Sequence, residues 1–325
     1  MRLIGLAVVL TLSLIAPPLA VEAQQPDKIP RIGYLHAGTP PNTDVEVFRK
    51  TLNDLGYVEG RSITIEFRWA QDRMDRLSPL AAELVALKVD VIVVGSTPAI
   101  KAVAERTKTI PIIMTVIADP VAAGLVQSLR HPGGNVTGIT LIAHELSGKR
   151  IELLKEAVQR LSRLAVLWNP ANPTHAVALR ESQSAARTLG LQTVPVAVQA
   201  AAEIDQAFAT MARERVSALF VLDDTILFTE RKRIAYLALR NRLPVASGIS
   251  AYADAGALLT YGARLRDLYY RAAFFVDKII KGAKAADLPV EQPTKFELVI
   301  NLKTAKELDL TIPPSVLGRA DRVIE

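Results

Sequence analysis

Apolar and polar positions follow two patterns along the chain, and the two patterns alternate. Short apolar runs, such as residues 89–94, are typical of strands that are buried on both faces of a parallel sheet. Segments between them, such as 43–55, carry an apolar residue every three or four positions, which is the spacing of a helix with one buried face. Alternation at 63–69 predicts a half-exposed edge strand. Strands that alternate with helices in this way predict an α/β fold with parallel sheets.

The second half of the chain repeats the plan of the first half. Two strands, a Leu-Gly helix end and an apolar-Pro strand start recur after about 130 residues, which indicates an internal repeat. We therefore predict two doubly wound lobes, each a parallel sheet covered by helices on both faces. The landmarks at 31–36, 55–56, 89–95 and 110–112 correspond to those at 163–168, 189–190, 216–222 and 243–245.

The pattern changes after Ser247. A strand at 257–261 and a helix at 265–281 precede a second strand and helix, at 296–300 and 302–308. These elements are too few for a third domain, so we expect them to complete the two lobes and to join them by a multi-strand hinge. The expected boundaries are 28–141 with 249–284 for lobe 1 and 142–248 with 285–325 for lobe 2.

The first 23 residues have the pattern of a signal peptide. Arg2 precedes an apolar segment at 3–16, and small residues at 21–23 place cleavage after Ala23. The apolar segment is shorter than the ~20 residues that span a bilayer as a helix. We expect an exported protein, periplasmic if the source is bacterial, and not lipid-anchored because the chain has no Cys.

Composition narrows the possible chemistry. The absence of Cys excludes thiolate catalysis and Cys-ligated metals, and the four His lack the spacing of metal ligands. Glycine-rich nucleotide loops and the nucleophile elbow of hydrolases are absent from the sequence as well. The net charge of +6 is scattered, and its densest cluster, 231–233, lies in a predicted amphipathic helix. We therefore expect no cofactor, no metal and no nucleic-acid partner.

Ligands of open α/β sheets bind beyond the carboxyl ends of the strands, so the residues at those ends are candidate contacts. Residues 95–98 read Gly-Ser-Thr-Pro, and Ser96 and Thr97 suit the N-terminus of the next helix. The free N–H groups there also suit a ligand carboxylate, and capping is compatible with binding. The further candidates at strand ends are His36, Asn172 and Ser247.

Three carboxylates and one indole at strand ends leave alternatives open. Asp119 precedes a predicted helix at 121–129 and would either cap it or bind an amine. Of Asp223 and Asp224, one is expected to cap the next helix and the other to be free for a cation or a polar solute. A catalytic acid–base pair is a third alternative for these two carboxylates. Trp168 would either stack on a ligand ring or lie partly buried between the lobes.

Several short motifs follow one another in an order that resembles one family. They are GY at 56–57, EG at 59–60, DVIV at 90–93, STPA at 96–99, IPI at 110–112, DPVAAGL at 119–125, PGGNVTG at 132–138, LPVE at 288–291 and KTA at 303–305. Together they resemble the ABC transporter substrate-binding proteins of the tryptophan/tyrosine-binding type, which have the type I periplasmic binding fold. The resemblance covers nearly the whole chain after the leader.

The resemblance implies a monomeric, two-lobed clamp that closes on a small solute, such as an amino acid, and presents it to a membrane permease and ATPase. By position, Ser96 and Thr97 would receive the carboxylate, Asp119 and Asp223 would face the amine, and Asn172 would lie across the cleft. The family commonly has DNT where this chain has DDT at 223–225, which adds a negative charge.

Two other classes of function are compatible with the sequence. A periplasmic sensory domain would bind the solute without transport, and an exported enzyme would use Asp223 and Asp224. A regulator of the LacI type would share the fold, but the leader and the missing helix-turn-helix argue against it.

Overall fold

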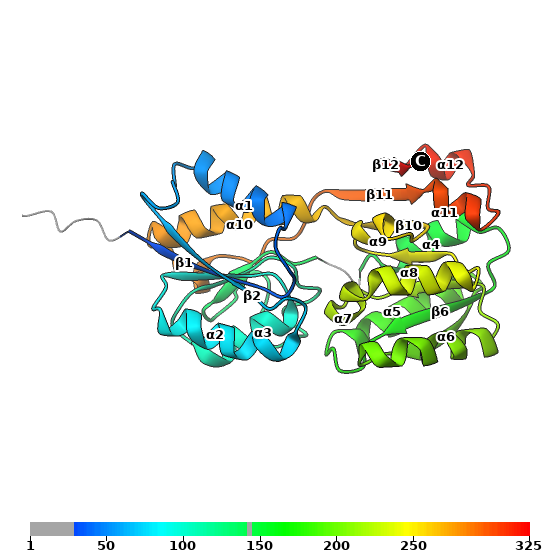
Figure 1. The fold of residues 1–325 in the computed structure, drawn as a ribbon, viewed down its shortest axis with the longest axis horizontal. Helices are drawn as coiled ribbons and strands as arrows, with labels where there is room; N and C mark the ends of the chain where they lie inside the picture. Colours follow the sequence, from blue (N-terminus) through cyan, green and yellow to red (C-terminus); the bar gives the residue numbers. More distant parts are fainter. Residues whose placement is uncertain (1–28, 142–144) are drawn as a thin grey trace, which may run out of the picture.

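The computed structural model describes residues 29–141 and 145–325, and they form two α/β lobes (Figure 1). The expected signal peptide at 1–23 lies outside the described residues. Within the described part of the chain, no helix is both long enough and apolar enough to cross a membrane.

Lobe 1 contains a five-stranded parallel sheet in the order β2-β1-β3-β4-β5. Helices α1 and α10 cover one face and helices α2 and α3 the other, and each face buries its own apolar cluster. The strands are β1 (Arg31–His36), β2 (Thr64–Trp69), β3 (Val91–Val94), β4 (Ile112–Met114) and β5 (Val136–Gly138). The helices are α1 (Thr43–Asp54), α2 (Leu77–Ala86), α3 (Thr97–Arg106) and α10 (Leu265–Ile280), with short 3₁₀ turns at η1 (Met74–Arg76) and η3 (Ala285–Asp287).

Lobe 2 contains a seven-stranded sheet in the order β12-β11-β10-β9-β8-β6-β7. Its strands are β6 (Arg163–Trp168), β7 (Gln192–Ala197), β8 (Ala218–Val221), β9 (Val245–Ser247), β10 (Leu259–Ala263), β11 (Phe296–Asn301) and β12 (Arg322–Ile324). Five of them, β7-β6-β8-β9-β10, repeat the order of lobe 1, so the predicted repeat is confirmed. Strand β11 runs antiparallel to β10.

Helices cover both faces of the lobe 2 sheet as well. One face carries α4 (Ser147–Ala157), α5 (His175–Thr188), α11 (Leu302–Glu307) and α12 (Pro314–Leu317). The other carries α6 (Ile204–Arg213), α7 (Thr225–Thr229), α8 (Arg231–Arg240) and α9 (Ala251–Asp254), with a 3₁₀ turn at η2 (Ala201–Glu203).

The lobe boundaries differ from the expected ones in two places. Residues 249–263 belong to lobe 2, because β10 pairs with both β9 and β11 and buries Leu259 in the lobe 2 core. Residues 285–291 belong to lobe 1, where Val290 is buried and Glu291 forms a bridge with Ile139. The chain therefore passes between the lobes after β5, after β10 and before β11 (Figure 1).

The segment after Asp119 is a series of turns rather than the predicted helix at 121–129. The N–H groups of Gly124 and Leu125 donate to the carbonyls of Val121 and Pro120, and Gly124 has a φ of 69°. This left-handed conformation is accessible to glycine and ends helical propagation, so the apolar spacing alone was misleading.

Candidate functional site

The strand ends of the two lobes face a common cleft that encloses about 840 Å³, part of it open to solvent. The cleft has polar groups at several strand ends and an apolar wall, which is the usual composition of a small-molecule site. From lobe 1 it is lined by His36, Asn42, Asp44, Asp72, Ser96, Thr97, Val116 and Tyr269. From lobe 2 it is lined by Asn172, Asp223, Asp224, Phe228 and Ile249.

Ser96 and Thr97 lie where β3 passes into α3. Ser96 is the N-cap: its Oγ accepts a hydrogen bond from the N–H of Ala99 at 3.4 Å, and its backbone is extended. Pro98 follows in the first turn, where the missing N–H costs nothing. The predicted capping role of Ser96 is confirmed, and the positive end of the α3 dipole points into the cleft beside both side chains.

His36 ends β1, and Asn42 precedes α1 on the same wall of the cleft. The N–H of Gly38 donates to Nδ1 of His36 at 2.9 Å. The Oδ1 of Asn42 accepts from the N–H groups of Asp44 and Val45, at 2.9 and 3.1 Å, and so caps α1. Burial lowers the pKa of His36 to about 4, and the charge of nearby Asp72 opposes this only in part. The imidazole is therefore neutral at neutral pH.

Asp224 caps α7 and organises the lobe 2 wall. Its Oδ1 accepts from the N–H groups of Ile226 and Leu227, at 2.8 and 3.2 Å. Its Oδ2 accepts from the amides of Asn169 and Asn172, at 3.2 and 3.0 Å. Asn172 therefore lines the cleft from lobe 2, opposite the α3 terminus of lobe 1, and is held there by Asp224.

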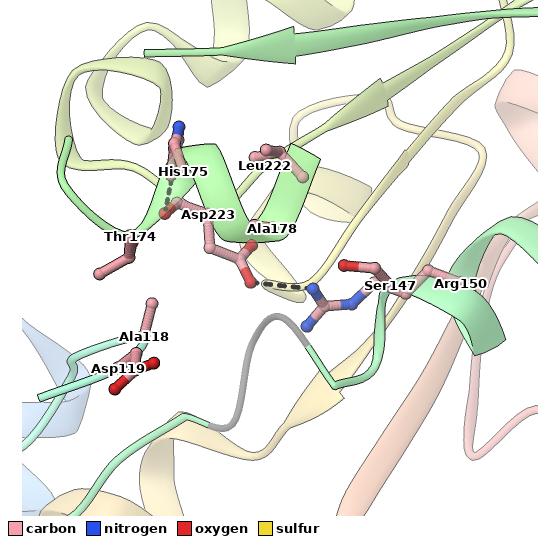
Figure 2. Close-up of a pocket in the computed structure, with 9 residues that line it drawn as sticks. All are labelled: Ala118, Asp119, Ser147, Arg150, Thr174, His175, Ala178, Leu222 and Asp223. Atoms are coloured by element: carbon pink, nitrogen blue, oxygen red, sulfur yellow. Dashed lines mark hydrogen bonds and ion pairs between the residues drawn. The ribbon is translucent and has the colours of Figure 1, made fainter. Parts of the chain in front are cut away.

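With Asp224 as the cap, Asp223 is the carboxylate that the sequence left for a cation or a polar solute, but it is paired with Arg150 of α4. Its Oδ2 lies 3.1 Å from Nη1 of Arg150, and the two side chains are only 4% and 3% exposed. Figure 2 shows this ion pair between the end of β8 and α4. The Nε of Arg150 also donates to the carbonyl of Tyr261 at 2.7 Å. Two glycines leave room for the guanidinium of Arg150. A Cβ on Gly248 would lie 2.2 Å from its Nη2, and a Cβ on Gly262 would lie 3.3 Å from the same atom.

Asp119 lies in a smaller pocket beside the main cleft. Its Oδ1 accepts from the N–H groups of Val121 and Ala122, both at 2.9 Å, so it caps a turn rather than a helix. In Figure 2 it approaches with Ala118 from lobe 1, while the remaining lining of this pocket comes from lobe 2. That lining includes Ser147, Arg150, Thr174 and His175.

Trp168 and Ser247 are not brought into the cleft. Trp168 is partly buried against the core of lobe 2, and its strand partner is Ala197 of the edge strand β7. Ser247 is 0% exposed, because β9 lies between β8 and β10 inside the sheet. A residue at the end of a strand therefore lines the cleft only where the strand itself ends at the surface of the cleft.

Several cleft residues were not predicted. Asn42 and Asp44 follow a Pro-Pro pair and open a helix, which is a recognisable capping pattern. Arg150 carries no local signal, since its partners Asp223 and Tyr261 are far away in sequence. In residues 29–141 and 145–325, no three His, Asp or Glu side chains are grouped in a way that would hold a metal ion.

Comparison with known proteins identifies the family. The sequence profile of the ABC transporter substrate binding proteins matches residues 41–324. The chain belongs to this family. A curated relative, the tyrosine-binding protein of Clostridioides difficile strain R20291, is 30% identical over 263 residues, which cover 81% of this chain and 75% of the relative.

Solved structures of substrate-binding proteins have the same two-lobed fold. A domain from Streptococcus pneumoniae in complex with L-Trp is 28% identical, with a TM-score of 0.84 over 91% of this chain and 99% of that one. A substrate-binding protein with adhesive properties from Clostridium difficile, in its ligand-free, open structure, is 26% identical, with a TM-score of 0.68 over 91% and 99% of the two chains.

Proposed function

We propose that this substrate-binding protein captures an amino acid, or a related small carboxylate, in the cleft between its lobes and delivers it to an ABC importer. The observation that carries the proposal is the composition of the cleft. The N-terminus of α3 lies on the lobe 1 wall, Asp223 and Asp224 lie on the lobe 2 wall, and apolar side chains from both lobes complete the lining. A zwitterion with an apolar side chain matches these three features.

The proposed contacts follow from this arrangement. Ser96 and Thr97, with the N–H groups of α3, receive the ligand carboxylate. Asp224 gives the opposite wall its negative charge, and no ion pair among the described residues includes it, whereas Asp223 is already neutralised by Arg150. The charge of Asp224 therefore attracts the amine to this wall, although its oxygens already accept hydrogen bonds from the protein, and Asp119 and Asp223 lie beside it. Asn172 completes the lobe 2 side.

The apolar wall supports an aromatic side chain on the ligand. Phe228 and Tyr269 contribute rings to the cleft from the two lobes, together with Val116 and Ile249. Aromatic rings pack well against such a wall. The names of the relatives agree with this class, since one is called tyrosine-binding and another was solved with L-Trp.

Hinge closure is part of the proposal. The two solved relatives are almost equally similar in sequence and are covered to the same extent, yet the TM-score is 0.84 with the tryptophan complex and 0.68 with the open, ligand-free structure. Because the fold is shared, the arrangement of the two lobes is the natural source of this difference. We infer that the lobes move about their connections, close on the solute in the periplasm, and release it to a permease and its ATPase.

The geometry does not favour an enzyme that uses Asp223 and Asp224. Asp223 is buried in an ion pair, and both oxygens of Asp224 already accept hydrogen bonds from the protein. A general acid or base has to exchange a proton with the substrate, which neither carboxylate is placed to do.

Isothermal titration of the twenty amino acids tests the proposal. We expect one chemical group of amino acids to bind with saturation and to be recovered unchanged. Phe228→Ala should weaken that binding at least about tenfold, because it removes a ring from the apolar wall. Tyr236→Ala is the matched control, since Tyr236 is an exposed ring outside the cleft. A lack of binding by every amino acid would refute the assignment, and consumption of the ligand would indicate an enzyme.

A further inference from the structure

The lobe 1 side of the cleft contains two hydrogen-bond donors that face each other. The N–H of Gly38 donates to Nδ1 of His36, so this nitrogen carries a lone pair and the proton of the neutral ring is on Nε2. The Oδ1 of Asn42 accepts two backbone N–H groups, so its Nδ2 is turned the other way. That Nδ2 lies 3.4 Å from Nε2 of His36.

Two donors at this distance do not satisfy each other. Both residues line the cleft, and an oxygen atom on the cleft side of the pair, about 2.9 Å from each nitrogen, would accept from both. Among the described residues, the only polar partner of each donor is the other donor. Both donors face the cleft, where a ligand oxygen that accepts from them takes the place of water, so the pair forms a site for such an oxygen.

The neighbouring charges decide what kind of oxygen fits. Asp44 lies beside Asn42, to which its N–H donates, and Asp72 lies close enough to His36 for its charge to act on the ring; both carboxylates line the cleft. They repel a carboxylate or phosphate placed there. A hydroxyl group avoids this repulsion, because its oxygen accepts from the two donors while its proton is given to a carboxylate.

We propose that His36, Asn42, Asp44 and Asp72 form a site, here called the hydroxyl corner, that binds a hydroxyl group of the ligand. This inference rests on the proposed function, in which the ligand carboxylate lies at α3. The apolar wall between the two ends then holds the body of the ligand, and a phenol side chain combines both features. The hydroxyl corner selects hydroxylated ligands over their deoxy counterparts.

The first test compares tyrosine with phenylalanine, which differ by one hydroxyl group. We expect the protein to bind tyrosine at least about tenfold more tightly, which corresponds to one well-made hydrogen bond. Asn42→Asp keeps the cap of α1, because Asp is an equally good N-cap, but replaces the donor with an acceptor. It should bring the two affinities close together. Asn53→Asp, at an exposed position of the same helix, should leave the ratio unchanged. Equal affinities in the wild-type protein would overturn the inference and leave the amino-acid assignment intact.

The second test does not depend on an amino acid. Nitrogen-15 NMR of the histidine rings should show His36 as the neutral Nε2–H tautomer, and phenol, but not toluene, should shift its Nε2 resonance. Asn42→Asp should abolish that shift. If no amino acid binds but phenol behaves in this way, the proposed function fails and the hydroxyl corner stands. An Nδ1–H ring, or a ring that phenol leaves unchanged, would refute the hydroxyl corner.

Discussion

The imidazole of His36 is held in its neutral form by burial, and this has a consequence for stability. Its pKa is about 4 in the folded protein and 6.5 in an unfolded chain, so the unfolded state binds more protons between these values. The free energy of unfolding therefore falls as the pH is lowered from 6.5 towards 4. The expected loss is about 3 kcal/mol at most, and urea denaturation over this pH range measures it.

His36→Phe keeps an aromatic ring at the end of β1 but has no titrating group. Its unfolding free energy should change less steeply over the same pH range. Equal slopes for the variant and the wild-type protein would show that His36 titrates normally in the folded state.

The buried pair of Arg150 and Asp223 should respond differently to single and double substitution. Arg150→Met leaves a buried carboxylate without its cation and should cost about 3–5 kcal/mol of unfolding free energy. Adding Asp223→Asn removes the orphaned charge, so the double variant should be more stable than the single variant. Denaturation midpoints of the three proteins provide the comparison. A double variant less stable than Arg150→Met would contradict the ion-pair account.

The sequence predicts local roles of residues better than distant ones. The caps formed by Ser96 and Asp224 could be foreseen because a cap and its helix are adjacent in the chain. The ion pair of Asp223 with Arg150 could not be predicted, because the packing of α4 on the sheet brings Arg150 to it. The placement of Ser247 was missed for a related reason, because its neighbours on both sides come from other strands.

Among the elements, the repeated strand order is the part of the fold that the apolar pattern predicted. The pattern failed where one glycine decided the outcome, as at Gly124, and where the fifth strand of lobe 2 was assigned to lobe 1. Strand β10 has the same position in its sheet as β5 in lobe 1, so the repeat itself pointed to the right lobe. The strand predicted at 296–300 is β11, but it has no counterpart in lobe 1, so the repeat does not indicate that it runs antiparallel to β10.

Strand β10 also contains a glycine that its surroundings require. A Cβ on Gly262 would lie 1.9 Å from the carbonyl oxygen of Gly248. Gly262→Ala should therefore force the backbone apart and lower the unfolding free energy by about 2 kcal/mol or more. Gly134→Ala is the matched control, because a Cβ there meets no atom within 4 Å. Thermal unfolding of both variants tests the difference, and similar melting temperatures would count against the close approach.

For the molecule as a whole, the proposed closure makes a direct spectroscopic prediction. Because the chain has no Cys, two introduced Cys residues can carry a dye pair without background labelling. Lys50 of lobe 1 and Tyr236 of lobe 2 are exposed positions for them. Saturating ligand should change the energy transfer between the dyes, with a midpoint equal to the Kd from calorimetry. Unchanged transfer at full occupancy would show that the lobes bind the solute without moving.

The last two passages of the chain between the lobes, after β10 and before β11, also affect the order in which the protein can fold. Helix α10 covers the sheet of lobe 1, and β11 continues the sheet of lobe 2, so each lobe depends on residues from the last quarter of the chain. Contacts between residues so distant in sequence form late and slowly. Lobe 1 is complete only after α10 and residues 285–291 have been synthesised, and lobe 2 only after β11 and β12, so the last quarter of the chain is needed by both.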